Sequence, residues 1–386
     1  MNNVQLLLTQ RESGVSLSTE KRGRIPGLDG LRTIAVMVVF VSHYITAVLP
    51  SMPKLHDLFP GMLGVTLFFV LSGFLISTLL SREYESTRSI NVRDFYVRRL
   101  LRLTPALYAY VTLTLLAYLL FDGSVVVADF VSAVTYTSNY YQLFAKTALY
   151  YMPVWSLAIE EHFYLLFPAL MFWCLRDRKV GLLTAVALGI VAISLWRFYV
   201  ATRPGMDWHQ IYVRTDTRLD SILYGVLLMC VAAKMGAEWT RDKLGSYYTL
   251  AAGVAILAIS VVYRGELFRM SWRYNLQGVA LLLIIGFIVF SQTALGKFSR
   301  TTLDSAPMRY ISDRSYSLYL YHLTLLKLAE HVSGGLTPRD ALMCALGSFV
   351  LAHLSYRHVE QPFLGLRRRF GSHEEEPLAV QLSRAA

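Results

Sequence analysis

The chain has 386 residues, of which 55% are hydrophobic and only 16% charged, and its mean hydropathy is +0.44. These values exclude an ordinary soluble domain and indicate a protein that crosses a membrane several times. The formal net charge of +11 would also suit a nucleic-acid-binding protein, so the positions of the basic residues must decide between the two.

Residues 1–26 are polar, and the first apolar run is too long for a cleavable signal peptide, so we expect a cytoplasmic tail followed by a retained first span. A span needs about 20 mostly apolar residues. Segments of this kind lie at roughly 28–50, 61–80, 103–121, 154–174, 181–200, 216–233, 246–263, 275–292, 314–332 and 340–357. We therefore predict an all-α membrane protein, a polytopic bundle of about ten transmembrane helices over residues 27–363, with a cytoplasmic tail at 364–386.

The basic residues are distributed unevenly between the predicted loops. With the N-terminus in the cytoplasm, and with Arg314 and Arg357 at the cytoplasmic ends of their spans counted with the loops, 25 lysines and arginines fall on the cytoplasmic side and 8 on the outer side. This asymmetry predicts that both termini are cytoplasmic, and it accounts for the net charge without nucleic acid. The three cysteines all lie in apolar runs, which indicates neither disulfides nor a metal site.

The first span, GLDGLRTIAVMVVFVSHYIT, carries Arg32 near its cytoplasmic end and His43 about 10 Å below its outer end, by the helical rise. Ionisable groups in a span are costly and normally face the bundle interior, which makes His43 a candidate functional residue; a hydrogen bond between helices is the simpler alternative.

FYVRRLLRLTP, at the start of the third predicted span, places Arg98, Arg99 and Arg102 at the cytoplasmic side. Residues 98 and 102 are one turn apart, so we expect them to point the same way. Guanidinium groups on one face suit phosphate oxygens and predict a polyanionic cytoplasmic ligand. A topology signal alone is the alternative.

The fourth span opens with WSLAIEEHFY, which puts Glu160 and Glu161 about 8 Å below the outer surface, at the depth predicted for His43. Neighbours on a helix differ by about 100°, so we expect one of the two carboxylates to be structural, paired with an arginine such as Arg197 or Arg218.

Two further features lie on the outer side. The sixth span, TDTRLDSILYG, brings in Arg218 and Asp220, which together with the preceding groups predict a polar cavity in the outer half. The outer loop at about 122–153 is rich in tyrosine (Tyr136, Tyr140, Tyr141, Tyr150 and Tyr151). These tyrosines form either an interfacial belt or a surface for stacking on a sugar; Trp155 is likewise either an interfacial anchor or part of a binding surface.

Seven motifs together resemble acyltransferase family 3, a family of integral membrane O-acyltransferases. They are GLDGLRTIAV, GVTLFFVLSGFLIS, FYVRRLLRLTP, WSLAIEEHFYLLFP, TDTRLDSILYG, ISDRSYSLYLYH and SYRHVEQPF, in the family's order from Gly27 to Phe363. The chain departs from the family's usual pattern at two places. His162 stands where the family usually has glutamine, and Asp313 and Arg314 interrupt the sixth motif, where the family usually has an ISYSLYL-type sequence. The chain looks like the stand-alone membrane form, without the esterase-like domain that some relatives append.

The resemblance implies a protein of a bacterial inner membrane. It also implies transfer of an acyl group, most often acetyl, from cytoplasmic acyl-CoA to a hydroxyl of a cell-envelope carbohydrate such as O-antigen or exopolysaccharide. A macrolide is an alternative acceptor. A proton-coupled exporter of a glycan or lipid precursor, using His43, Glu160 and Asp220 as a relay, is a rival from another class, and a non-catalytic envelope protein is a third.

The residue roles expected on this basis fall into three groups. We expect His43 to act as a general base or as a transient acyl carrier, with Glu160 or Glu161 orienting it or binding the acceptor hydroxyl. Arg32, Arg98, Arg99 and Arg102 are expected to hold the coenzyme phosphates. The expected substrate-binding residues are Trp155, Ser156, Arg218, Asp220 and His322. No metal is indicated, and Arg357 with Glu360 is expected to form a structural pair.

Overall fold

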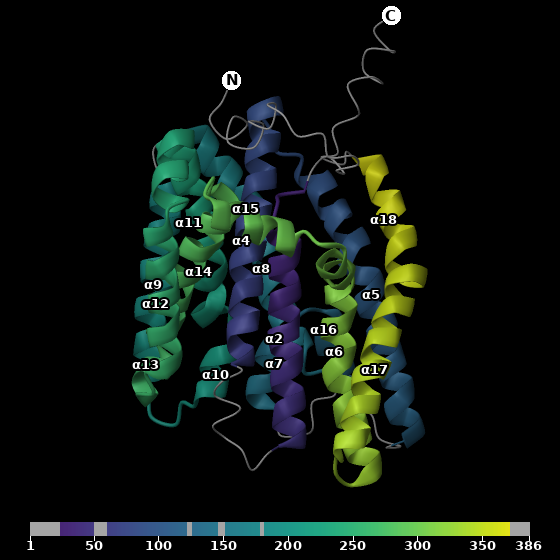
Figure 1. The fold of residues 1–386 in the computed structure, drawn as a ribbon. Helices are drawn as coiled ribbons and strands as arrows, with labels where there is room; N and C mark the ends of the chain where they lie inside the picture. Colours follow the sequence, from purple (N-terminus) through teal and green to yellow (C-terminus); the bar gives the residue numbers. More distant parts are fainter. Residues whose placement is uncertain (1–23, 50–59, 122–125, 146–150, 178–180, 371–386) are drawn as a thin grey trace, which may run out of the picture.

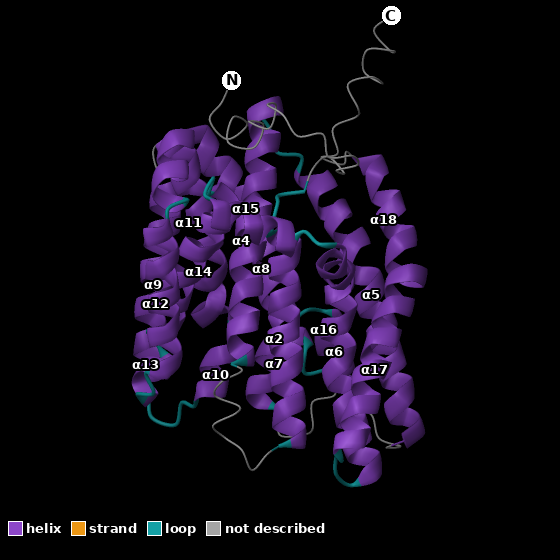
Figure 2. Ribbon diagram, in the orientation of Figure 1, coloured by secondary structure: helices purple, strands orange, loops and turns teal. Residues whose placement is uncertain are grey.

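The computed structural model describes residues 24–49, 60–121, 126–145, 151–177 and 181–370, which are helical apart from short connections, with no strand among them (Figure 2). The helices are α2 (Leu28–Val48), α4 (Gly61–Thr87), α5 (Val92–Phe121), α6 (Val127–Val134), α7 (Ser138–Phe144), α8 (Val154–Asp177), α9 (Leu182–Ala201), α10 (Trp208–Val213), α11 (Thr215–Trp239), α12 (Tyr247–Val262), α13 (Glu266–Met270), α14 (Arg273–Phe290), α15 (Ala294–Leu303), α16 (Ala306–Ser333), α17 (Pro338–Ser355) and α18 (Gln361–Arg367). The segments predicted at 1–23 and 371–386 as parts of the two tails lie outside these residues, as does Tyr150.

Each of the ten predicted spans overlaps one helix, but α4, α5, α8, α11 and α16 extend beyond the predicted span by three to eleven residues at one end. Within the described part of the chain, seven of these helices are long and apolar enough to cross a membrane, namely α2, α4, α5, α8, α9, the α11 segment and α14. The other three, α12, α16 and α17, do not meet these criteria of length and apolar character; α12 has only 16 residues. The prediction of an all-α membrane protein is therefore confirmed, while the count of ten spans is not.

The helices form two groups around a central set (Figure 1). In the view of Figure 1, α9, α11, α12 and α14 stand on the left and α5, α16, α17 and α18 on the right. Between them lie α2, α4 and α8; α4 packs against α11 on one side and α2 on the other, and α2 packs in turn against α16. A cavity between the central set and the right-hand group is therefore enclosed by helices from distant parts of the sequence.

Two glycines allow α4 and α11 to cross in direct backbone contact. A Cβ atom at Gly73 would lie 1.9 Å from the carbonyl oxygen of Ile222, and one at Gly225 would lie 1.9 Å from that of Val70. Small residues allow this close approach in membrane bundles, where van der Waals packing is a main force between helices. Gly73, the second glycine of GVTLFFVLSGFLIS, thus has a packing role.

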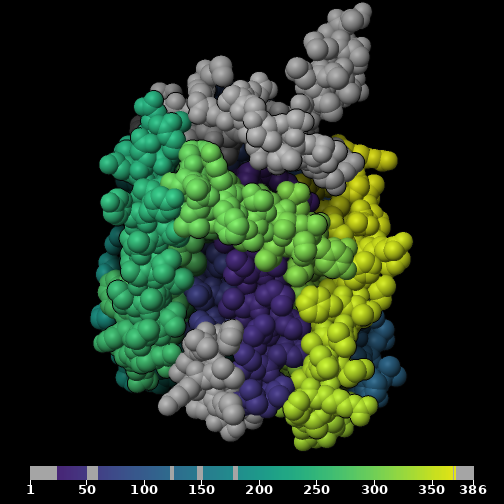
Figure 3. All heavy atoms as spheres, viewed as in Figure 1, coloured from purple at the N-terminus to yellow at the C-terminus, as the bar shows by residue number. Residues whose placement is uncertain are grey.

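Helix α15 lies across the beginning of α2 (Figures 1 and 3). Gly27, which precedes α2, has φ 85°, a left-handed conformation suited to glycine. Its backbone N–H donates to Oδ1 of Asp304 at 2.9 Å, just after α15. This contact fixes the start of α2 below the end of the bundle, so Arg32 lies inside the protein.

Both described ends of the chain lie at the same end of the bundle. Arg24 binds Asp29 and Asp313 with its two terminal nitrogens, at 2.6 and 3.2 Å. At the other end of the chain, the carbonyl of Phe370 accepts a hydrogen bond of 2.8 Å from Arg98, near the start of α5. An even number of crossings, as the sequence predicts, would produce this arrangement.

Candidate functional site

A cavity of about 650 Å³ opens between α2, α4, α5, α8 and α16. This volume falls within the usual range of small-molecule sites, about 300–1,000 Å³. Its charged lining residues are Arg24, Asp29, Arg32, Arg99, Arg102, Glu160, Asp313, Glu360 and Arg367. Since Arg24 pairs with both aspartates, the other arginines and the two glutamates dominate the interior.

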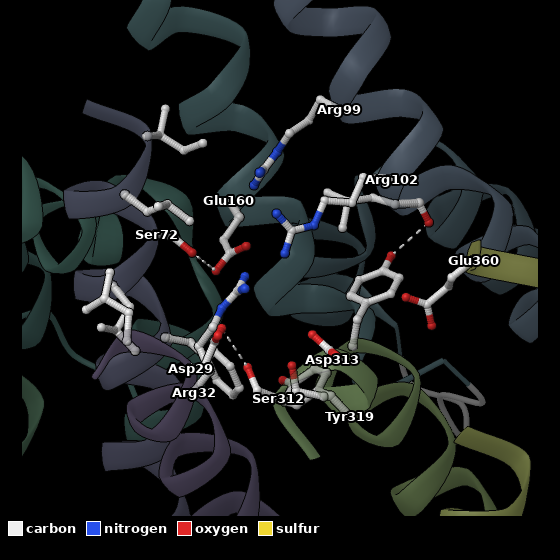
Figure 4. A pocket seen from close by; sticks show the side chains of 18 of the residues that line it. Asp29, Arg32, Ser72, Arg99, Arg102, Glu160, Ser312, Asp313, Tyr319 and Glu360 are labelled. Atoms are coloured by element: carbon white, nitrogen blue, oxygen red, sulfur yellow. Dashed lines mark hydrogen bonds between the residues drawn. The ribbon is translucent and has the colours of Figure 1, made fainter. Parts of the chain in front are cut away.

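Three guanidinium groups converge in this cavity (Figure 4). Arg32 comes from α2, while Arg99 and Arg102 come from α5, and all three point toward the space beside Glu160. Arg99 stacks on the Tyr164 ring, with 3.4 Å from Cζ to the ring centroid. Among the residues that the structure describes, neither Arg32 nor Arg102 makes a hydrogen bond or an ion pair. Because charge enclosed in a membrane protein is costly, this cluster is suited to an anionic ligand.

Arg98 does not belong to this cluster, contrary to the expected pairing of residues 98 and 102. It bridges Oε2 of Glu83 at 3.3 Å and the carbonyl of Phe370 at 2.8 Å, and it does not line the cavity. At about 100° per residue, Arg102 lies between Arg98 and Arg99 around α5, so it could share a face with either. In the folded bundle, Arg102 lines the cavity together with Arg99.

Glu160 and Glu161 diverge, as expected for neighbours on a helix. Glu160 lines the cavity and accepts hydrogen bonds from Ser72 at 3.0 Å and Tyr164 at 3.3 Å. Glu161 points to the other side, with Oε1 4.0 Å from Nε of Arg99. One glutamate does pair with an arginine, as expected, but the examples Arg197 and Arg218 are wrong, because the partner is Arg99.

The predicted common depth of Glu160 and His43 is also wrong. The backbone N–H of Gly61 donates to Ser42, the neighbour of His43, at 3.2 Å. The Glu160 partner Ser72 follows Gly61 by eleven residues, or about 16 Å along α4. Glu160 therefore lies at the level of Arg32, because α8 begins inside the protein: Tyr151, just before it, is 5% exposed.

The inner end of the cavity is closed by polar and aromatic side chains. The hydroxyls of Ser156 and Tyr319 lie 2.7 Å apart, and both residues line the cavity. The Phe68 ring meets the Tyr319 ring edge-on, with centroids 6.2 Å apart. Of the expected substrate-binding residues, Ser156 thus reaches the cavity, whereas Trp155 is 8% exposed and packs against the rings of Phe69 and Tyr212.

Two histidines lie directly beyond Tyr319. His43 Nδ1 and His322 Nε2 are 2.9 Å apart, and the two rings stack with centroids at 5.1 Å. The ring of His322 is 5.8 Å from that of Tyr319. His43 itself does not line the cavity, but its partner His322 lies next to Tyr319, which does.

Arg218 and Asp220 belong to an enclosed network of buried polar groups and do not line the polar cavity that was predicted for the outer half. Both are 0% exposed. Asp220 accepts a 2.7 Å hydrogen bond from Arg197, also fully buried. Arg218 donates to Thr66 at 3.0 Å and stacks 4.0 Å above the Tyr274 ring. These contacts join α4, α9, α11 and α14, so the structure gives both residues the surroundings of structural groups.

Glu360 lies at the mouth of the cavity and does not pair with Arg357 as expected. Its Oε1 accepts a 2.6 Å hydrogen bond from Ser317, and burial raises the pKa of its carboxyl to about 7. Arg357 is exposed. Glu360 can therefore change charge near neutral pH in the space that the arginines line.

Some of the tyrosines predicted to lie in an outer loop make contacts inside the protein. Tyr140 donates to Asp216 at 3.2 Å, and the adjacent His162 Nδ1 is 2.8 Å from the hydroxyl of Thr215. Tyr151 donates to the carbonyl of Val111 at 3.3 Å. These contacts hold α7 and the start of α8 against α5 and α11, which favours a structural role for the tyrosines over a free surface.

Sequence reasoning missed Ser72, Tyr164 and Tyr319 as parts of the site. A signal was present for Tyr319, because it precedes His322 by three residues and so shares its helix face. Ser72 and Tyr164 carried no comparable signal. The structure describes no group of three or more His, Cys, Asp and Glu side chains, within its residue ranges, that could hold a metal ion.

Comparisons with known proteins agree with the motifs. A family model described as "Acyltransferase domain" matches residues 25–357. A Staphylococcus aureus (strain COL) protein named as an O-acetyltransferase is 31% identical over 370 residues, which is 89% of this chain and 58% of that protein. O-acetyltransferase OatA of S. aureus (strain NCTC 8325) is 31% identical over 88% of this chain and 57% of its own length. The chain thus spans less than three fifths of these relatives, and no solved structure matches it.

Proposed function

Since the chain belongs to the acyltransferase family whose model covers residues 25–357, we propose that it moves an acetyl group from acyl-CoA to a hydroxyl of a cell-envelope carbohydrate. The donor enters from the cytoplasm and the acceptor from the outer side. The relatives named O-acetyltransferase support the reaction type. The excess of basic residues in loops on one side supports an inner-membrane orientation with both termini cytoplasmic.

The convergence of Arg32, Arg99 and Arg102 is the observation that carries this proposal. Their guanidinium groups supply planar donors suited to phosphate oxygens. They line a cavity at the end of the bundle where Arg24 and Phe370 also lie. A nucleotide diphosphate held there stays at the cytoplasmic end, and its thioester arm points along the cavity toward Tyr319.

His43 is the group best suited to activate the acceptor. The acceptor hydroxyl loses its proton to the neutral imidazole while its oxygen attacks the thioester carbonyl carbon. The C–S bond then breaks, the coenzyme thiolate takes up the proton from His43, and the ester is released. Glu160 lies beside the arginines, about 16 Å along the bundle from His43, so its role in this scheme is to shape the donor cavity.

The proposal is tested with protein purified in detergent, radiolabelled acetyl-CoA and an extract of envelope glycan. We expect His43→Ala to abolish transfer while the protein remains folded, as judged by size-exclusion chromatography and thermal melting. His358→Ala, which changes an exposed histidine, is the matched control. Full transfer by folded His43→Ala would refute the catalytic role. Flux driven by a proton gradient without a requirement for coenzyme A would support an exporter instead.

A further inference from the structure

The hydrogen bonds of His322 fix which of its nitrogens carries the proton. Its Nδ1 lies 2.8 Å from the carbonyl oxygen of Tyr319 and 3.1 Å from that of Leu318. Carbonyl oxygens only accept hydrogen bonds, so Nδ1 must donate and therefore carries the hydrogen. In the neutral ring, Nε2 is then the nitrogen with the lone pair.

The tautomer of His322 determines the tautomer of His43. The 2.9 Å contact joins His322 Nε2 to His43 Nδ1. Because Nε2 of the neutral His322 ring can only accept, Nδ1 of His43 must donate, which leaves its own lone pair on Nε2. The opposite assignment would need a protonated His322. That side chain is 1% exposed, and its partners among the described residues are two carbonyls and a histidine, with no carboxylate.

The surroundings keep the His322 ring in this orientation. The rings of Phe40 and Tyr319 each lie 5.8 Å from it, centroid to centroid, and His43 lies 2.9 Å from its Nε2 edge. A rotated ring would leave the two backbone carbonyls without this donor and His43 without its acceptor. The helix α16 backbone therefore determines the tautomer of a residue on α2.

We infer that His322 is a positioning residue which holds His43 in the tautomer with its proton on Nδ1, so that Nε2 is the nitrogen that accepts the proton of the acceptor hydroxyl. This inference rests on the proposed function. When His43 takes up that proton, its Nδ1–H still donates to His322, and the hydrogen bond becomes charge-assisted and stronger. His322 thus stabilises the imidazolium that forms during transfer, without itself touching either substrate.

The first test is the tautomer in the otherwise unaltered protein. With ¹⁵N-labelled histidine, the ring signals of His43 among the nine histidines are assigned by comparison with His43→Ala. We expect a protonated Nδ1 and an unprotonated Nε2 at neutral pH. A proton on Nε2 of His43 would overturn the inference, and this measurement needs no variant at position 322.

The second test separates positioning from packing. His322→Leu keeps an apolar side chain but has no acceptor, and we expect its kcat to fall about 10- to 100-fold, the loss usual when the partner that orients a metal-bound histidine is removed. The KM for acetyl-CoA should not change, because the arginines are intact. His322→Gln can again accept from His43 through Oε1, so it should recover most of kcat.

The outcomes distinguish the inference from the proposed function. An unchanged kcat in folded His322→Leu, or equal losses in the leucine and glutamine variants, would contradict the positioning role while leaving His43 as the base. Full transfer by His43→Ala would instead remove the proposed function, whichever tautomer is observed. If His322→Leu does not fold, the tautomer in the unaltered protein decides the inference.

Discussion

Replacing Arg99 and Arg102 together by alanine is expected to weaken acetyl-CoA binding by at least about a hundredfold. A hydrogen bond to a charged group contributes about 1.5–3 kcal/mol, so two such contacts contribute about 3–6 kcal/mol. At 1.36 kcal/mol per tenfold change, this corresponds to a factor of about 150 or more. Neighbouring arginines are not independent, which favours the lower end of this range.

The two arginines contribute differently because their surroundings differ. Arg102 has no ion pair or hydrogen bond within the described ranges, so its loss removes contacts to the ligand and little else. Arg99 also stacks on Tyr164 and lies 4.0 Å from Glu161. Its loss leaves a half-buried carboxylate without its cation, so Arg99→Ala should also lower the melting temperature.

The assay is equilibrium binding of tritiated acetyl-CoA to protein purified in detergent, with thermal melting to confirm folding. Arg93→Ala is the charge-matched control, because Arg93 is exposed on the same helix. Arg98→Ala should have a smaller effect on affinity than Arg102→Ala, since Arg98 binds Glu83 instead of lining the cavity. A folded double variant with the affinity of the unaltered protein would show that these arginines set topology only.

Three further predictions follow from the packing and charge of the bundle. Asp220→Ala leaves the buried charge of Arg197 without its partner and should cost about 3–5 kcal/mol of stability; melting in detergent measures it, and an unchanged midpoint would contradict the argument. Gly73→Ala should destabilise the crossing of α4 and α11 by about 1–3 kcal/mol or more, whereas Gly181→Ala, with open space around it, should be tolerated; equal yields of folded protein would argue against the close contact. Acetyl-CoA affinity should fall as the pH rises through about 7, because the Glu360 carboxyl loses its proton there and becomes a negative charge in the cavity; the same pH dependence in Glu360→Gln would assign it elsewhere.

The membrane helices were predictable because their signal is local and strong. Twenty apolar residues in sequence have few alternatives to a span, and each predicted segment overlaps one helix, although several helices extend beyond it. The arginine cluster was predictable in part for the same reason. Which two of Arg98, Arg99 and Arg102 share the cavity was not, because that depends on where α2 and α8 pack against α5.

The depth of Glu160 could not be obtained by counting residues. Counting assumes that a span begins at the membrane surface, but α8 begins beneath α6 and α7, where Tyr151 and Trp155 are already buried. Apolar composition does not reveal this inward start. The pairing of His43 with His322 was missed for a related reason, since contacts between helices distant in sequence are set by packing and have no spacing rule.

The separation of arginines from histidines has a physical rationale in the proposed reaction. Arg32 and His43 lie on one helix, eleven residues or about 16 Å apart. Moving phosphates across that distance would place several negative charges in an apolar interior, away from the arginines that line the cavity, which is costly. A thioester carries its acyl group uncharged, so only a neutral arm needs to pass Phe68 and Tyr319. The phosphates can stay at the arginines, while the one proton that must move is taken up by a histidine pair whose hydrogen-bond partners in the described part of the chain include no carboxylate.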